Sequence, residues 1–493
     1  MEYISGEGRD QITMMPDRID DYVDENNAVR VIGAYINSLN LIELGFAGAE
    51  LNGTGRPPYD PADLLKLYMH GCLNRVRSSR RLEAETKRNL EAIWLLGKLS
   101  PDHKTIARFR HDNGAALKNV FRDFAKRCLK LDLYGKELAA IDGGKFKAAN
   151  SRARNFTKQQ IENKISKVTE KIAQYLEELE RNDAAEAAAS GEKTAAEITA
   201  IINSLKASQA RYQGHAAELE RSGEKQKSLA DPDSRLMTPN GRAMDACYNA
   251  QTAVDAKHKP IADFAVSSQG NDKNFIAPMA AGVKEALETE TIAVVADAGY
   301  ESVQDTIAAM GQGADVHVAG TDFGICVPAA EGEHGAITAH HNGRCVYIAG
   351  RNIALCPMGN VLHPKYRTAS REDQGAFFNY AECKTCASKC TKGPRGRCRC
   401  FVPMAKADFT KEYNGQGLAA KQIRIKPGPD IVKRRKAIVG RPFGTIKRAM
   451  DAGCFLAKGL RNVAGEFALT CLAYNLKRAI NILGCNKLIE NMV

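Results

Sequence analysis

The chain lacks the two sequence features that would send it into a membrane or out of the cell. Its opening residues, "MEYISGEGRDQITM", hold no basic segment followed by an apolar one, so we expect no secretory signal. No run of 18 apolar residues occurs anywhere, so we expect no membrane-spanning helix. These two absences together favour a cytoplasmic protein.

Acidic residues are fewer than basic ones, and one segment almost lacks them. The chain has 70 Lys and Arg against 58 Asp and Glu, a net charge of +12. Between Lys421 and Arg448 there are ten basic residues and a single acid, Asp430. Dense positive charge favours a polyanionic partner such as a nucleic acid, although a merely solvated basic face is the alternative. Within this segment "KRRKAIVGRPFGTIKR" predicts a basic helix that ends or bends at Gly440-Arg441-Pro442 and offers no carboxylate.

With 493 residues and 44% hydrophobic residues, the chain is long enough for several globular domains. Six of its 14 cysteines lie between Cys356 and Cys400. The spacing Cys383-x2-Cys386-x3-Cys390 is typical of thiolate ligands of structural Zn²⁺, and Cys356, Cys398 or Cys400 could supply the fourth ligand. The alternative is a reduced, metal-free loop.

Residues 1–130 have the apolar spacing of short helices. Asp60-Pro61 is a good helix start, because Asp caps the free N–H groups and Pro suits the first position. A cluster of arginines is expected at a junction between two helices: Arg75, Arg77, Arg80 and Arg81. Such a junction fits a helix-turn-helix-like DNA-binding unit, with a plain helical bundle as the alternative.

Residues 157–225 repeat apolar residues at spacings of three and four, interrupted by an Ala-rich turn. This pattern predicts a helical hairpin with coiled-coil-like packing. Strand-like sequence resumes directly after it, so we expect the hairpin to be an insertion. It could provide subunit contacts, or it could pack only on its own core.

Two acids each follow an apolar run that predicts a buried strand. Asp142 ends the run Leu138–Ile141, which breaks at Gly143-Gly144, and Asp297 ends "TIAVVAD" before Ala298-Gly299. Two carboxylates on neighbouring strands can hold Mg²⁺ or Mn²⁺, and two such ions roughly 3.5–4 Å apart assist phosphodiester cleavage. The alternative is that each Asp is a turn residue, as Asp before Gly often is.

The order of several motifs resembles bacterial insertion-sequence transposases of the DDE type, specifically insertion-sequence family 1182. The motifs are "RSSRRLEAE", "SPDHKTIARFR", "AIDGGKFKAANS", "YNAQTAVD", "VVADAGYES", "CPMGNVL", "ECKTCASKC", "PFGTIKR" and "LAYNLKRAINILG". Each is weak alone, but together they cover nearly the whole chain in the family's order.

The resemblance implies an α/β protein with an RNase H-like catalytic core. It implies an InsH-like helical DNA-binding domain at 1–130 and a core at 131–156 and 226–325, interrupted by the hairpin at 157–225. A Cys-rich insert at 326–420 and C-terminal helices at 421–493 complete this division. The implied function is cleavage of transposon ends and joining of the freed 3′ hydroxyl to target DNA, with two Mg²⁺ or Mn²⁺ ions held by Asp142 and Asp297.

The third acid of this family lies on the final helix, in a pattern like "VEHPFGTIK". Here the string is "VGRPFGTIK", so Gly440 stands at the position of the expected Glu and Lys447 at that of the family's Lys. Loss of this carboxylate removes a metal ligand and predicts an impaired or inactive copy. Asp451 is about three helical turns away, and Glu466 is better explained as a structural ion pair.

The resemblance implies DNA as the partner, both the terminal inverted repeats and the target, and a homo-oligomer associated with the bacterial nucleoid. The expected DNA contacts are Arg75, Arg77, Arg80, Arg81, Arg434, Arg435, Arg441, Lys447 and Arg448. Two alternatives stay open: a non-catalytic protein that binds transposon ends and regulates active copies, and a residual nuclease that nicks without joining strands.

Overall fold

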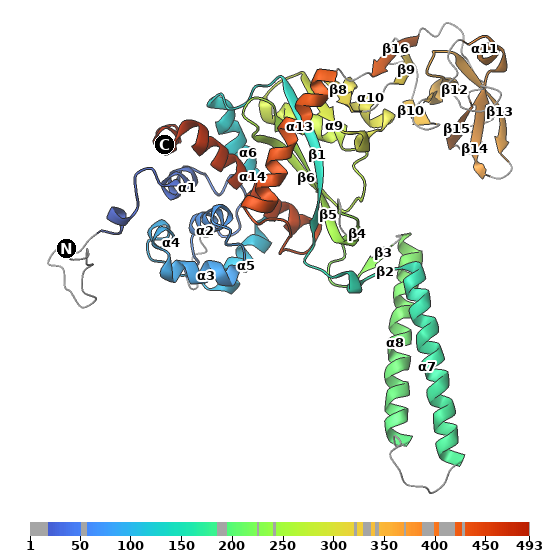
Figure 1. Cartoon of the computed structure of the whole chain (residues 1–493), viewed down its shortest axis with the longest axis horizontal. Helices are drawn as coiled ribbons and strands as arrows, with labels where there is room; N and C mark the ends of the chain where they lie inside the picture. The colour runs from blue at the N-terminus through green and yellow to red at the C-terminus, as the bar shows by residue number, and fades with distance from the viewer. Residues whose placement is uncertain are drawn as a thin grey trace, which may run out of the picture.

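The computed structural model describes residues 18–50, 57–184, 195–223, 226–239, 243–319, 323–328, 337–340, 345–368, 371–386, 399–403, 420–425 and 429–492. These residues form a mixed α/β structure with several sheets, which confirms the expected class (Figure 1). No helix within the described ranges combines the length and apolar character needed to span a membrane.

The N-terminal part is helical. After a 3₁₀ turn at Ile19–Tyr22 come α1 (Ala28–Asn37), α2 (Pro61–Leu73), α3 (Ser79–Arg88), α4 (Leu90–Leu95), α5 (His103–Asp112) and α6 (Gly114–Lys130). Local capping explains where they begin: Asp60 accepts from the backbone N–H of Ala62, with Pro61 at the first position of α2 as predicted. Ser78 likewise caps α3 by accepting from the N–H of Arg81.

The central sheet has the order β4-β5-β1-β7-β8, with β6 also paired to β5. Its strands are β1 (Leu138–Lys147), β4 (Arg235–Met237), β5 (Asp245–Asp255), β6 (Ile261–Ser267), β7 (Ile292–Ala296) and β8 (Ala314–Val318). β5 is antiparallel to β1 and to β6, whereas β7 runs parallel to β1 and to β8. β1, which contains Asp142, and β7, which Asp297 follows, are therefore neighbours in the sheet.

The prediction that the first strand breaks at Asp142-Gly143-Gly144 is wrong. β1 continues to Lys147 and stays paired with β5 along this stretch. The glycine is needed for close packing and not for a turn: a Cβ on Gly143 would lie 2.5 Å from Gln251 Nε2 and 2.6 Å from Asp272 Oδ1. A side chain at this position would displace polar groups that border the site.

Helices cover the sheet. They are α9 (Ile276–Leu287), α10 (Val303–Gly311), α13 (Pro429–Gly444) and α14 (Leu460–Leu483), with a 3₁₀ turn at Ala298–Tyr300, and α15 (Cys485–Glu490) packs on α1 and α14. α13 packs against β1, β5 and β7, and α14 packs against α6 and β6, so the N-terminal helices and the sheet share one hydrophobic core. α13 does not end at Gly440-Arg441-Pro442: it runs through Pro442 and continues as a π-helix over Thr445–Ala449.

A long helical hairpin projects from the rest of the molecule (Figure 1). Its helices are α7 (Lys158–Ala184) and α8 (Ala195–Ser222), and the short strands β2 (Asn155–Thr157) and β3 (Gln226–Ser228) pair at its base. Two apolar clusters lie between the helices, one around Ile161 and Leu219 and one around Ile172 and Ile202. The hairpin therefore has a core of its own.

A small β unit lies at the other end of the molecule from the N-terminal helices (Figure 1). Its strands are β10 (Ile337–His340), β11 (Cys345–Ile348), β12 (Ile353–Leu355), β13 (Val361–Thr368), β14 (Arg371–Phe378) and β15 (Cys400–Pro403), with α11 (Tyr380–Thr385). The chain enters it through β9 (Phe323–Pro328) and leaves through β16 (Ala420–Ile425), which pair antiparallel. Through this pairing, the segments that lead into and out of the unit lie side by side.

Candidate active site and nucleic-acid interface

Asp142 and Asp297 face one another across neighbouring strands. Asp142 lies within β1 and its side chain is 21% exposed, while Asp297 follows β7 and is 41% exposed. The parallel register that pairs Ala140 with Val295 brings both acids to the same edge. Asp297 also accepts from the N–H of Gly299 at 2.8 Å, which fixes the turn after β7.

A single arginine from α13 bridges the two acids. Arg435 Nη2 lies 3.0 Å from Asp142 Oδ1 and 3.0 Å from Asp297 Oδ2. The Arg435 side chain is only 12% exposed, and its Nε is buried without a hydrogen-bond partner among the residues that the structure describes. One guanidinium nitrogen therefore occupies the point on which both carboxylates converge.

Burial raises the pKa of Asp142 to about 6. Arg435 opposes this rise because its positive charge favours the carboxylate, whereas the negative charges of Asp297 and Asp272 add to it. Burial thus outweighs the stabilising effect of Arg435 on the Asp142 carboxylate.

A third aspartate, Asp272, lies beside the pair and is held by a polar network. Its Oδ1 accepts from Lys145 Nζ at 3.2 Å, Asn249 Nδ2 at 2.7 Å and Gln251 Nε2 at 2.8 Å. The Gln251 side chain in turn accepts from the hydroxyl of Tyr300, which belongs to the turn after Asp297. The network joins β1 and β5 to the loop after β6.

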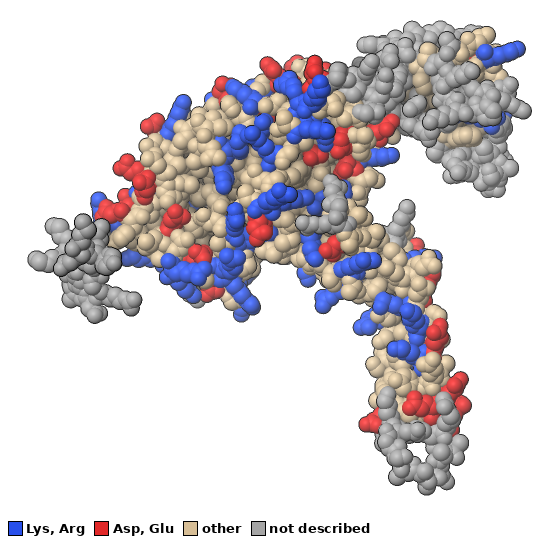
Figure 2. Space-filling model, viewed as in Figure 1, with Lys and Arg blue, Asp and Glu red and all other residues tan. Residues whose placement is uncertain are grey.

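A groove of about 820 Å³ opens beside Asp142 and is lined by four cations and, besides Asp142, by the acids Asp245 and Asp451. Its cations come from β1 and from the π-helix after α13: Lys145, Lys147, Lys447 and Arg448. Lys447 donates to the carbonyl of Lys145 at 3.1 Å and lies 4.4 Å from the centre of the Phe146 ring. Figure 2 shows Lys and Arg gathered over the middle of this face, where α13 and β1 lie in Figure 1.

The position predicted for the third acid is open. Gly440 lies on α13 five residues after Arg435 and is exposed, and no heavy atom of the described part of the chain lies within 4 Å of where a Cβ would stand. Burial lowers the pKa of Lys259, and the positive charges of Arg441 and Arg478 lower it further. The neighbouring Arg441 therefore lies close to two other cations. A longer side chain at Gly440 would meet no steric obstacle at its first carbon.

Asp451 and Glu466 are the two acids to compare with the carboxylate that is missing at Gly440. Asp451 lies on the wall of the same groove as Asp142. The helix ends at Ala449, so Asp451 is not separated from Gly440 by three turns of one continuous helix. Glu466 is 5% exposed and fully engaged: it pairs with Arg77 at 2.7 Å and accepts from the N–H groups of Leu456 and Ala457. Glu466 therefore has a structural role.

The predicted DNA contacts differ in whether their side chains are exposed to solvent or turned inward. Arg80, Arg81, Arg434, Arg441 and Arg448 are exposed. Arg75 is also exposed, and its Nε donates to the carbonyl of Ala449 at 2.6 Å. By contrast, Arg77 and Arg435 are turned inward to Glu466 and to the aspartate pair.

The cysteines of the small β unit pack in one apolar cluster that contains Cys345, Cys356 and Cys400, with Cys383 against it. Cys386 is half-buried, and Cys390 lies outside the described residues. Within the described ranges no group of three or more His, Cys, Asp or Glu is placed to hold a metal ion. The zinc set Cys356, Cys383, Cys386 and Cys390 stays a prediction.

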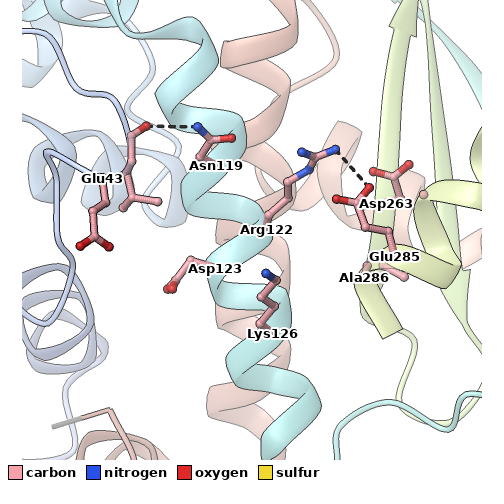
Figure 3. A pocket seen from close by; sticks show the side chains of 11 residues that line it. Glu43, Asn119, Arg122, Asp123, Lys126, Asp263, Glu285 and Ala286 are labelled. Carbon is pink, nitrogen blue, oxygen red and sulfur yellow. Dashed lines mark hydrogen bonds and ion pairs between the residues drawn. The ribbon is translucent and has the colours of Figure 1, made fainter. Parts of the chain in front are cut away.

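A second cavity, of about 310 Å³, lies between α6, β6 and α9 and has a mixed charge (Figure 3). Arg122 reaches from α6 toward Asp263 and Glu285, at 3.7 Å from the Glu285 carboxylate. Gly282 makes room for Asp263, because a Cβ there would collide with the carboxylate. This cavity shares no lining residue with the groove beside Asp142.

Sequence reasoning found the aspartate pair but missed its neighbours. Asp272 follows no strand pattern, and Gln251 and Lys145 sit inside strands where they look like ordinary outward-facing polar residues. The sequence places Arg435 only among the expected DNA contacts. No local signal could have shown that its partners lie 293 and 138 residues away along the chain.

The donor set at the aspartate pair does not fit a divalent ion as the chain stands. Carboxylate oxygens are suitable ligands for Mg²⁺ or Mn²⁺. However, the guanidinium of Arg435 takes the position between them, and the third acid position is Gly440. No catalytic step through a metal follows from this arrangement.

Two family models match the chain. The model described as "Transposase domain (DUF772)" matches residues 17–112, and the model described as "Transposase DDE domain" matches residues 355–480. The second match includes α13 and α14 but begins after Asp142 and Asp297. No curated protein matches the chain. The two matches support a transposase function, and the chain is consistent with a DDE transposase, a DNA-cleaving enzyme of a kind that generally uses divalent metal ions.

Proposed function

We propose that this chain is an insertion-sequence transposase, related to family 1182, that binds transposon ends but is impaired in strand cleavage. The observation that carries the proposal is the groove that reaches Asp142 and contains four cations, combined with Gly440 at the position of the expected third acid. The strand order β6-β5-β1-β7-β8, antiparallel and then parallel, supports an RNase H-like core.

The groove would hold the DNA backbone. Lys145, Lys447 and Arg448 provide positive charge along one wall, and Phe443 and Phe146 keep Lys447 in place through ring contacts. Phosphates bound there would lie beside Asp142 and Asp297, the acids that we propose as the remaining catalytic positions. Arg80 and Arg81 at the start of α3, exposed to solvent, would extend the contact.

The second candidate is a non-catalytic protein that binds transposon ends and regulates active copies. The bridge from Arg435 to both aspartates favours it, because the acids already have a cation partner. A cleavage assay with the unchanged chain separates the two functions, because a regulator would bind transposon ends and leave them intact in Mg²⁺ or Mn²⁺.

The hairpin of α7 and α8 is a candidate for contacts between two copies on paired ends. Its projection away from the core leaves both helices accessible (Figure 1). Mass measurement of the chain with and without end DNA tests this, and a monomer bound to each end would exclude it.

The first experiment is end binding. The full chain is mixed with duplexes carrying the inverted repeats that flank its gene, and with scrambled duplexes of equal length. We expect at least tenfold tighter binding to the repeats, and weaker binding of both duplexes by the double variant Lys447→Gln/Arg448→Gln. Equal affinity for repeats and scrambled DNA would exclude a transposon-end protein.

A further inference from the structure

We propose that the half of the α7–α8 hairpin next to the core is a second DNA-binding surface. It would hold the phosphate backbone of the same duplex that occupies the groove beside Asp142. The surface consists of four cations, called the hairpin face from here on: Lys164, Lys167, Lys171 and Arg211. This inference rests on the proposed function, because it concerns the same DNA, and it extends the contact to a part of the chain outside the groove.

Charge is unevenly distributed along the hairpin. Next to the core, residues 152–171 hold six basic residues and two acids, and residues 206–223 hold three basic residues and two acids. Farther out, residues 172–180 and 196–205 hold four acids and no basic residue. Figure 2 shows this change along the hairpin, with Lys and Arg mostly near the junction with the core and Asp and Glu toward the tip. A polyanion therefore suits only the half near the core.

The four cations form one patch. Lys164, Lys167 and Lys171 follow one another at spacings of three and four residues, so they project from the same side of α7. Lys164 Nζ lies 5.5 Å from the centre of the Tyr212 ring, and the guanidinium carbon of Arg211 lies 5.6 Å from it. Both helices therefore contribute cations to the patch around this tyrosine.

The cations of the hairpin face are available to a ligand. Lys167, Lys171 and Arg211 are exposed, and within the described ranges none of them forms an ion pair. Elsewhere on the hairpin a lysine is already paired, since Lys158 lies 2.9 Å from the carboxylate of Glu220. An unpaired, exposed cation can neutralise a phosphate without first breaking a contact within the protein.

The hairpin face continues the contact surface of the groove. The chain passes from β1 to the hairpin through a 3₁₀ turn that carries the exposed Arg152 and Arg154, and β2 and β3 pair at the base. Figure 2 shows the basic half of the hairpin on the same side of the molecule as the cations over α13 and β1. Lys164 and Lys171 are about 10 Å apart along the helix, the length of about three base pairs. A duplex bound in the groove can therefore reach several phosphates' worth of additional positive charge.

The first test measures the salt dependence of binding by the full chain to a long duplex that carries the inverted repeat. We expect Lys167→Gln/Lys171→Gln to bind at least fivefold more weakly at low salt. The slope of log affinity against log salt should fall by about 2, because each neutralised phosphate contributes about −0.9. Both positions are exposed, so the substitutions leave the hairpin core intact. An unaltered slope overturns the inference.

Lys158→Gln/Lys206→Gln is the matched control, because it removes the same charge from the hairpin outside the hairpin face. Lys158 is paired with Glu220, and Lys206 is five residues from Arg211, about 140° around the helix. We expect the control to change the affinity less than twofold. A loss as large as that of Lys167→Gln/Lys171→Gln would show that only net charge matters, and it would overturn the inference.

Hydroxyl-radical footprinting on the same duplex, at saturating protein, locates the contact. Lys167→Gln/Lys171→Gln should lose protection at nucleotides that Lys447→Gln/Arg448→Gln still protects. Loss of no protection, or of the same nucleotides in both variants, overturns the inference. So does an unaltered salt slope together with dissociation of a dimer by Lys167→Gln/Lys171→Gln, because the hairpin face would then bind a second copy of the chain.

The inference and the proposed function fail in different ways. A chain that prefers the repeats but has the same salt slope with and without Lys167 and Lys171 retains the proposed function and loses the hairpin face. A chain that binds repeats and scrambled duplexes equally loses the proposed function. A slope that still falls by about 2 on the scrambled duplex then supports the hairpin face, because a backbone contact does not depend on sequence.

Discussion

Arg77 and Glu466 form an ion pair in which Arg77 Nη2 lies 2.7 Å from Glu466 Oε1, although 389 residues separate them in the chain. Arg77 precedes α3 in the N-terminal helical part, and Glu466 lies in α14 near the C-terminus. Their side chains are 13% and 7% exposed. The pair therefore ties the two parts that the two transposase family models match, and it removes Arg77 from the surface available to DNA.

Breaking this pair should destabilise the fold. Arg77→Ala removes the nearer cation from the buried Glu466 carboxylate and leaves it with backbone donors and with Arg110 at 3.8 Å, and we expect the free energy of unfolding to fall by about 2–4 kcal/mol. Urea denaturation followed by circular dichroism measures this. Arg108→Ala is the control: it breaks an exposed pair with Asp112 and should cost less than about 1 kcal/mol. A similar small cost for both variants would show that the buried pair does not join the two parts.

Gly440→Glu should restore cleavage of transposon-end DNA in Mg²⁺. The added side chain returns the missing carboxylate, and the absence of any heavy atom within 4 Å of its Cβ position lets it enter without a clash. We expect at least tenfold more cleaved product than with the unchanged chain, measured on end-labelled duplexes.

Gly440→Gln is the control for this gain, since glutamine has nearly the same shape without the charge. If it activates cleavage as well as glutamate does, the gain comes from helix propensity and not from a carboxylate. Cleavage by the unchanged chain at the rate of Gly440→Glu would instead point to another acid, and Asp451, on the wall of the groove, would be the next to substitute.

Arg448→Gln should lower the salt dependence of DNA binding. Each neutralised phosphate contributes a slope of about −0.9 to a plot of log affinity against log salt on duplex DNA, so losing one contact should reduce the slope by about 1. Filter binding measured at salt concentrations from about 50 to about 300 mM gives the slope. Lys487→Gln, an exposed change on α15, should leave it unaltered. An unaltered slope for Arg448→Gln would place its side chain off the DNA path.

Asp263→Asn should stabilise the protein at neutral pH. Burial raises the pKa of Asp263 to about 6, although Lys118 and Arg122 oppose the rise. Because this value exceeds the ordinary value of 3.8, ionisation is harder in the folded state, and stability falls as pH rises from about 4 through about 6. We expect Asn to raise the free energy of unfolding by about 1–2 kcal/mol at pH 7.5 and by much less at pH 4. An equal effect at both pH values would exclude ionisation as the cause.

Local patterns were enough to predict much of the fold. Asp60 and Pro61 predicted the start of α2, and the apolar runs before Asp142 and Asp297 predicted strands that do neighbour each other. The patterns failed at β1, where an end was expected, and α13 does not end at Gly440-Arg441-Pro442, where an end or a bend was expected. Gly143 leaves room for the side chains of Asp272 and Gln251. This need for space arises only when β5 and the loop after β6 pack against β1.

The sequence by itself determined which residues have the chemistry: two aspartates after apolar runs, a dense group of cations, and a glycine where an acid is expected. Only the tertiary structure decided how their charges are paired. It placed Arg435 between the aspartates and Arg77 against Glu466, while leaving Lys447 and Arg448 in the groove. The reason is physical. Periodicity along a chain shows which face of a helix is buried, but an ion pair depends on which distant charge the packed core brings within about 4 Å.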